Sequence, residues 1–184
     1  MVVKVTMRWL RLKTVWLAVI PFAWLADPGP VSLLLGAGLA LPGLWIRGWS
    51  AGTIHKNQKV AMTGPYAFTR NPLYLGSLFI GLGVSLAGGQ WGWPLFFLVF
   101  YVCIYSKTMA SEGRYLTEMF PDVYGEYASS VPMLFPRLTP RSGRNGIGAD
   151  RFCWAQYCRN KEWEAAIGVL AAFIVLGAKV LWGP

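Results

Sequence analysis

Arg70 is the charged side chain whose sequence context best fits a binding site. It stands between a turn, Gly64-Pro65, and an apolar segment that starts with Asn71-Pro72. Asparagine is favoured just before a helix and proline at its first position, so the pair predicts a helix start at residue 72. Helix starts carry unpaired N–H groups and a partial positive charge. Together these groups predict an anion site; the alternative is an arginine that only marks the end of a membrane span.

Glu112 is the second candidate, because it is the first carboxylate after the apolar segment 91–109. A carboxylate can bind an ammonium group or act as a base. Tyrosine rings, which can contact an aromatic or cationic ligand, lie in or beside the same two polar connectors: Tyr66, Tyr74, Tyr124 and Tyr127. Simpler explanations are a carboxylate favoured at a helix start for Glu112 and an aromatic belt at the membrane surface for the tyrosines.

The composition predicts an all-α integral membrane protein. Of its 184 residues, 55% are hydrophobic and 14% are charged, whereas a soluble domain carries about 25% charged residues. We expect one domain, residues 1–184, with about five transmembrane helices and a cytosolic cofactor-binding region between spans four and five. The expected spans are 14–26, 31–49, 72–87, 91–109 and 163–182, and the polar connectors are 50–71 and 110–162.

The basic residues predict the orientation in the membrane. If five spans alternate, all but one of the 17 Lys and Arg residues fall in residues 1–13, 47–71 and 107–162. The exception is Lys179. Because basic residues accumulate on the cytoplasmic side, the amino terminus and both connectors are expected in the cytoplasm. The same bias accounts for the net charge of +9 without any nucleic-acid partner.

No metal site is expected. The three cysteines, Cys103, Cys153 and Cys158, lack the two-residue spacing of zinc and redox sites, and His55 is the single histidine.

Aromatic residues gather again before the last apolar segment. Asp150 is expected to cap a short helix that carries Phe152, Trp154 and Tyr157. These aromatic residues are typical of a helix that lies at the membrane surface.

The order of these motifs resembles the isoprenylcysteine carboxyl methyltransferase family, and the related phospholipid N-methyltransferases share part of it. The resemblance covers about residues 45–136 and rests on Lys56-Asn57, Gly64-Pro65-Tyr66, Arg70-Asn71-Pro72-Leu73-Tyr74-Leu75-Gly76, Glu112, Phe120, Tyr124, Tyr127 and Val131-Pro132. The family signature is R-H-P-x-Y-x-G followed by paired glutamates. This chain has Asn71 in place of the histidine and Gly113 in place of the second glutamate.

The resemblance implies an integral membrane enzyme that uses S-adenosylmethionine and accepts a lipid-like substrate from the bilayer. It implies Arg70 and Glu112 as catalytic residues and a cofactor pocket made by Tyr66, Arg70, Asn71, Pro72, Tyr74, Gly76 and Glu112. The charges of these residues are consistent with this cofactor, because Glu112 can bind its ammonium group and Arg70 can bind a carboxylate.

The expected reaction is carboxyl O-methylation of an isoprenylcysteine-like amphiphile. One alternative is N-methylation of a phospholipid. Another is a non-catalytic membrane protein that retains the frame of the cofactor site, which the missing second glutamate keeps open.

Overall fold

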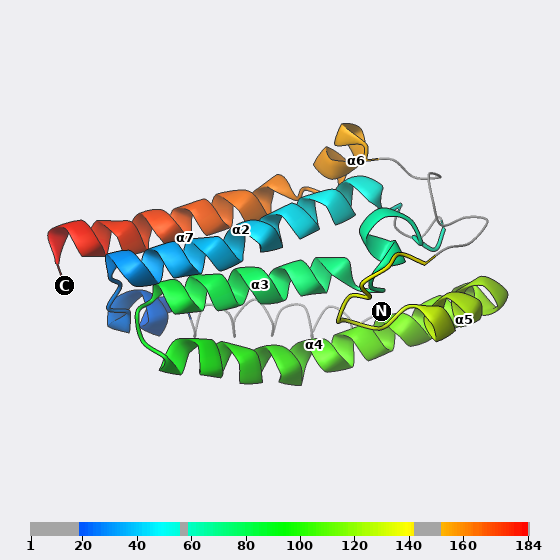
Figure 1. Ribbon diagram of the computed structural model, residues 1–184, viewed down its shortest axis with the longest axis horizontal. Helices are drawn as coiled ribbons and strands as arrows, with labels where there is room; N and C mark the ends of the chain where they lie inside the picture. The colour runs from blue at the N-terminus through cyan, green and yellow to red at the C-terminus, as the bar shows by residue number, and fades with distance from the viewer. Residues whose placement is uncertain (1–18, 56–58, 142–151, 184) are drawn as a thin grey trace, which may run out of the picture.

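The computed structural model describes residues 19–55, 59–141 and 152–183, and every regular element in these ranges is a helix (Figure 1). The long helices are α2 (Pro30–Thr53), α3 (Pro72–Ala87), α4 (Gly92–Met119) and α7 (Trp163–Trp182). Three shorter helices are the 3-10 helix η1 (Gly64–Ala67), α5 (Pro121–Ser130) and α6 (Trp154–Arg159). Residues 19–25 are helical as well.

The helices confirm the prediction of an all-α membrane protein. Helices α2, α4 and α7 are long and apolar enough to cross a membrane, and α3 is a shorter apolar helix of 16 residues. The number of spans stays a prediction, because residues 14–18 of the first expected span lie outside the described ranges. Asp150, the expected cap, lies outside them too, and α6 instead follows Cys153.

Two helices extend beyond the apolar segments that predicted them. Helix α2 continues past residue 49 to Thr53, and α4 continues past residue 109 to Met119. The polar residues 110–119 include good helix formers such as alanine, glutamate, leucine and methionine, so the chain leaves the apolar region without leaving the helix. Glu112 therefore lies inside α4, and the explanation of Glu112 as a helix-start carboxylate is wrong.

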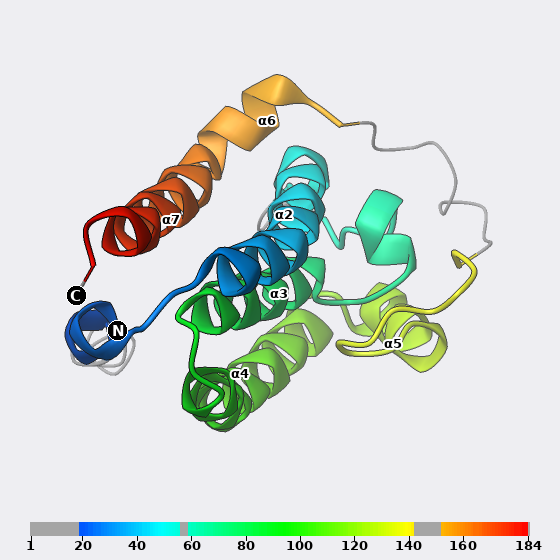
Figure 2. The same cartoon turned by 60° about the vertical axis from the view of Figure 1, so that its left-hand side comes forward.

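Paired glycines bring α2 and α3 into close contact. A Cβ atom on Gly36 would lie 2.5 Å from the carbonyl oxygen of Gly83, and one on Gly43 would lie 2.7 Å from that of Gly76. The partners are seven residues apart on each helix, nearly two helical turns, so both pairs fall on one line of contact. Small residues at such an interface let two backbones approach closely. Figure 2 shows α3 between α2 and α4.

Lys179 fastens the last helix to the first described one. Its Nζ donates hydrogen bonds to the carbonyl oxygens of Ala23, Trp24 and Ala26, at 3.2, 2.9 and 2.6 Å. These carbonyls end the helix at 19–25, where helices leave their last carbonyl groups without internal partners. This contact gives a structural reason for the one basic residue that stands apart from the others.

We expect Lys179→Met to lower the melting temperature of the detergent-purified protein. Removal of the charged group that donates to these carbonyl oxygens costs about 1–2 kcal/mol of stability, which corresponds to about 2–8 °C for a chain of this size. Lys107→Met is the control, because Lys107 is exposed on α4 and has no hydrogen-bond partner in the described ranges. A melting temperature equal to that of the control would contradict the capping role.

Candidate functional site

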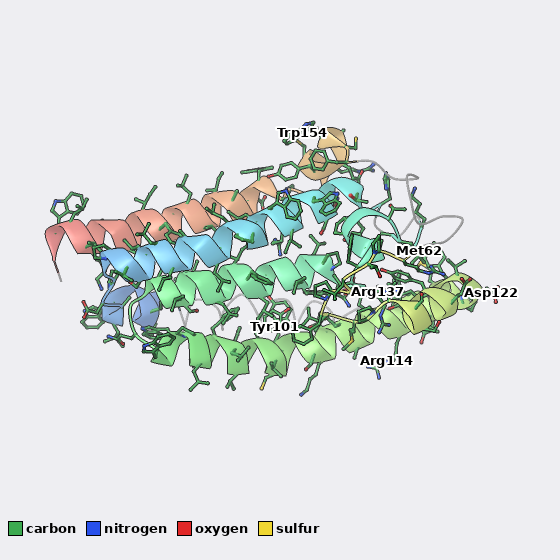
Figure 3. All side chains as sticks on the ribbon, viewed as in Figure 1. Met62, Tyr101, Arg114, Asp122, Arg137 and Trp154 are labelled. Carbon is green, nitrogen blue, oxygen red and sulfur yellow. The ribbon has the colours of Figure 1, made fainter. Side chains whose placement is uncertain are left out.

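A cavity of about 340 Å³ lies at the end of the bundle where α2 ends and α3 begins. Its wall comes from the end of α2, the connector with η1, the first turn of α3, the last turns of α4, and α5. The lining residues are Arg47, Ile54, Lys59, Val60, Ala61, Tyr66, Arg70, Asn71, Pro72, Leu73, Tyr74, Glu112, Gly113, Tyr115, Leu116, Tyr124 and Tyr127. The labelled side chains of Met62 and Arg137 lie at this end of the molecule in Figure 3.

Six of the seven residues expected from the sequence line this cavity: Tyr66, Arg70, Asn71, Pro72, Tyr74 and Glu112. Gly76 does not. A Cβ atom on Gly76 would lie 2.5 Å from Cγ of Arg47 and 2.7 Å from the Gly43 carbonyl oxygen, so this glycine lies in the contact between α2 and α3. Lys56 and Asn57 lie outside the described residues.

The segment before α3 is held in place by residues 132–134. The backbone N–H of Arg70 donates to the Pro132 oxygen at 2.9 Å. Asn71 occupies the expected position before the helix, but its side chain forms no cap and instead donates to the Met133 oxygen at 2.8 Å. The expectation of a polar side-chain cap is therefore wrong. The start of α3, which borders the cavity, therefore has no cap from the Asn71 side chain.

Arg70 offers a positive charge to the cavity. Its Nε atom is buried without a hydrogen bond, and its side chain forms no ion pair with any residue in the described ranges. Buried polar groups are nearly always paired in folded proteins, so an unpaired one in a cavity wall indicates a place for a ligand. Together with the uncapped start of α3, Arg70 makes this part of the wall suitable for an anion.

Tyr66 is the second buried group without a partner. Its hydroxyl lines the cavity and meets no hydrogen-bonding atom in the described part of the chain. Burial raises the pKa of Tyr66 well above its ordinary value, and the nearby Tyr127 and Glu112 raise it further. The hydroxyl is therefore protonated at neutral pH and can donate a hydrogen bond to a bound ligand. The Tyr127 hydroxyl holds the backbone of Tyr66 by donating to its carbonyl oxygen at 2.7 Å.

Glu112 completes the wall from the opposite side. The hydroxyl of Tyr74, in the first turn of α3, donates to Oε2 of Glu112 on α4 at 2.9 Å. The two halves of the site suggested by the sequence, 38 residues apart, thus meet through a direct hydrogen bond. The carboxylate is exposed on its other side and can accept a further donor, such as an ammonium group.

Gly113, the residue after Glu112, lies close to Tyr124. A Cβ atom there would lie 3.2 Å from the Tyr124 hydroxyl, which is tight, so Tyr124 occupies the side where a longer residue would extend.

Sequence reasoning missed Arg47 as a residue of the cavity. In the sequence, Arg47 stands near the end of an apolar segment, a position typical of a basic residue at the membrane edge. In the structure it lines the cavity and forms an ion pair with the buried Glu162, 115 residues away. The one available clue is topological. If two consecutive apolar segments pack as antiparallel helices, the end of the first lies near the start of the second.

Comparison with known sequences gives a family match. The sequence model of the phospholipid methyltransferase family matches residues 31–123, which is half of the chain and includes Arg70 and Glu112.

In the described ranges, no three His, Cys, Asp or Glu side chains lie together as a metal site would require. No solved structure matches the chain.

Three curated proteins are similar over part of their length. The cobalt-zinc-cadmium resistance protein CzcN of Cupriavidus metallidurans is 31% identical over 113 residues, covering 61% of this chain and 51% of that protein. The nickel-cobalt-cadmium resistance protein NccN of Alcaligenes xylosoxydans xylosoxydans is 30% identical over 108 residues, covering 58% and 49%. The protein-S-isoprenylcysteine O-methyltransferase of Schizosaccharomyces pombe is 29% identical over 84 residues, covering 46% and 36%. The chain thus spans about half or less of the length of these relatives.

Proposed function

The chain belongs to the phospholipid methyltransferase family, and we propose that it uses S-adenosylmethionine to methylate the carboxyl group of an isoprenylcysteine-like amphiphile. The observation that carries the proposal is a cavity lined by both Arg70 and Glu112. Nε of Arg70 has no hydrogen-bond partner among the described residues, and Glu112 accepts a hydrogen bond from Tyr74. The similarity to an isoprenylcysteine methyltransferase supports the carboxyl acceptor. The names of the other two relatives refer to metal resistance and state no reaction, so they do not select an acceptor.

The residues of the cavity fit the proposed cofactor. S-adenosylmethionine carries an ammonium, a carboxylate and a sulfonium group next to an adenosine. Glu112 would bind the ammonium, and Arg70 with the uncapped start of α3 would bind the carboxylate. The rings of Tyr66 and Tyr74 would contact the adenine or the sulfonium. The volume of about 340 Å³ lies at the lower end of the range for small-molecule sites.

The cofactor, when bound, supplies an electrophilic methyl group. A carboxylate acceptor, whose pKa in water is about 3.5, is already ionised at neutral pH, so the protein needs no general base for this reaction. The contribution of the chain is therefore orientation and exclusion of water. Arg70 and Glu112 would fix the cofactor from two sides, and the buried cluster of Val60, Tyr124, Tyr127 and Val131 would keep water away from the inner wall.

N-methylation of a phospholipid is the second candidate, and the description of the matched family favours it. An amine acceptor arrives protonated and needs a base, for which Glu112 is the carboxylate in the cavity wall. Transfer of a radiolabelled methyl group to a prenylcysteine acid and, in parallel, to phosphatidylethanolamine separates the two reactions. Mild base releases the radiolabel from a methyl ester, whereas a methylated amine retains it.

We also propose that residues 1–184 form one membrane domain with the amino terminus and the cavity in the cytoplasm. The support is the bias of Lys and Arg residues toward the connectors that form the cavity. Labelling of single cysteines in intact cells with a membrane-impermeant reagent would test the orientation.

Cofactor binding tests the proposed function directly. We expect S-adenosylmethionine and its demethylated product, S-adenosylhomocysteine, to raise the melting temperature of the detergent-purified protein. A ligand present at 100 times its dissociation constant stabilises by about 2.7 kcal/mol, which corresponds to about 5–10 °C here. Adenosine, which lacks the ammonium and carboxylate groups, is the control and should give a much smaller shift. No shift with millimolar S-adenosylhomocysteine would reject the methyltransferase proposal.

A further inference from the structure

Arg47 lies deeper in the bundle than Arg70. It is six residues before the end of α2, or about 9 Å along the helix axis. Its Nη1 donates to the Leu73 carbonyl oxygen at 3.3 Å and to the Ser77 hydroxyl, both in the first two turns of α3. Arg70, in contrast, precedes the first residue of α3. The cavity wall therefore has two arginines at different depths, Arg70 at the outer end and Arg47 toward the apolar helices.

The guanidinium of Arg47 is held on two sides and has donors to spare. Nε donates to Glu162 and Nη1 to α3, whereas Nη2 has no hydrogen-bond partner in the described ranges. An arginine side chain has five N–H donors in a rigid plane, and fixing part of that plane orients the rest. Because Arg47 lines the cavity, its remaining donors are available to a group bound there.

Glu162 is itself fixed by the segment that precedes α7. Its side chain is only 8% exposed, and it stands directly before the first residue of α7. Residues 153–160 donate hydrogen bonds to carbonyl oxygens at the end of α2. They include Cys153 N–H to Gly52, 3.0 Å; Gln156 Nε2 to Ile54, 2.6 Å; and Asn160 Nδ2 to Ala51, 2.7 Å. Figure 1 shows α6 over this end of α2. The carboxylate is thus held firmly where it meets Arg47.

We propose that Arg47 binds the anionic head group of the methyl acceptor and that Glu162 positions Arg47 for this role. The inference rests on the proposed function, which assigns Arg70 and Glu112 to the carboxylate and ammonium of the cofactor. Arg47 is then the cation at the inner end of the cavity, nearest the apolar helices. An acceptor bound there would keep its apolar tail along the spans and present its oxyanion toward the cofactor. A carboxylate or a phosphate has the planar or forked oxygens that a guanidinium binds best.

Binding to the protein saturated with S-adenosylhomocysteine tests this proposal. The probes are N-acetyl-S-farnesylcysteine, its methyl ester, and dodecyl phosphate. We expect the free acid to bind about tenfold or more tightly than the neutral ester. Arg47→Met should weaken binding of the acid about 10- to 100-fold and leave binding of the ester unchanged. Binding of dodecyl phosphate but not of the acid, with the same loss in Arg47→Met, would support an oxyanion site for a phosphate head group.

A charge exchange separates anion binding from a purely structural ion pair. In R47E/E162R the pair is restored with its charges reversed, so the end of α2 stays linked to the start of α7. If Arg47 only makes this link, the double variant binds the acid as the wild type does, and the proposal is overturned. We expect instead that the double variant binds S-adenosylhomocysteine but not the acid. Glu162→Gln should weaken binding of the acid less than Arg47→Met does.

The result also distinguishes this inference from the proposed function. Normal binding of the acid by Arg47→Met, with normal binding of S-adenosylhomocysteine, would overturn the role of Arg47 and leave the methyltransferase proposal intact. Failure of the wild type to bind S-adenosylhomocysteine would reject both. If the double variant does not fold, Arg47→Lys serves as the test instead, because lysine keeps the charge but lacks the forked donors. This variant should lose affinity for the acid and retain affinity for S-adenosylhomocysteine.

Discussion

Glu112→Gln is expected to lose most cofactor binding and methyl transfer while the protein stays folded. The substitution removes the negative charge from the cavity wall and keeps the size of the side chain. A hydrogen bond to a charged group contributes about 1.5–3 kcal/mol, so binding of S-adenosylhomocysteine should weaken about 10- to 100-fold. Tyr74 can still donate to the amide oxygen of the new side chain, so the contact between α3 and α4 is preserved.

A control on the same helix makes the experiment specific. Glu118 is exposed on α4, six residues after Glu112, and does not line the cavity. Glu118→Gln should bind S-adenosylhomocysteine as the wild type does, with the same melting temperature in the absence of ligand. The measurement is the ligand-induced shift of the melting temperature, followed by methyl transfer at low cofactor concentration. Equal shifts in the two variants would show that Glu112 does not bind the cofactor.

Gly43→Val is expected to have the largest effect on folding. A Cβ atom there would lie 2.7 Å from the Gly76 carbonyl oxygen and 2.9 Å from the backbone nitrogen of Ile80. These neighbours are backbone atoms and cannot rotate away, so α2 and α3 would have to separate. Overpacking of this kind costs about 1–3 kcal/mol or more. We expect a melting temperature lower by about 5–10 °C, or no recovery of monodisperse protein.

Gly38→Val is the matched control, since a Cβ atom on Gly38 meets nothing within 4 Å. Both substitutions place the same side chain on α2, so the difference between them isolates the close contact. Gly43→Val should also weaken S-adenosylhomocysteine binding, because separation of α2 from α3 moves Arg47 and the wall of the cavity. If Gly43→Val proved as stable as Gly38→Val, the packing of these two helices would have to be reconsidered.

Features that depend on neighbouring residues in the sequence were predicted well. Helix α3 runs from Pro72 to Ala87 as expected, because proline at its start and a glycine turn after its end are local signals. Composition alone predicts an all-helical membrane protein. An apolar chain with few charges is stable in a bilayer, where a helix pairs its backbone hydrogen-bonding groups internally.

Features of the interior of the site were not predictable in the same way. The end of the apolar segment at residue 109 indicates where α4 leaves the apolar region, not where this helix ends. The sequence therefore gives no sign that Glu112 lies inside α4. Gly76 belonged to the motif that suggested the cofactor pocket, yet the glycine packs against α2. A sequence pattern does not state which face of a helix meets a ligand and which meets another helix.

The sequence by itself determined the membrane class, the start of α3 and the identity of the two charged residues, Arg70 and Glu112, that face the cavity. These properties depend on composition and on neighbours a few residues apart. The tertiary structure alone decided that Tyr74 holds Glu112 and that Arg47 joins Glu162 at the inner end of the same cavity. Those pairs are 38 and 115 residues apart, and only the packing of α2, α3, α4 and α7 brings their charges and hydrogen-bonding groups within reach of one another.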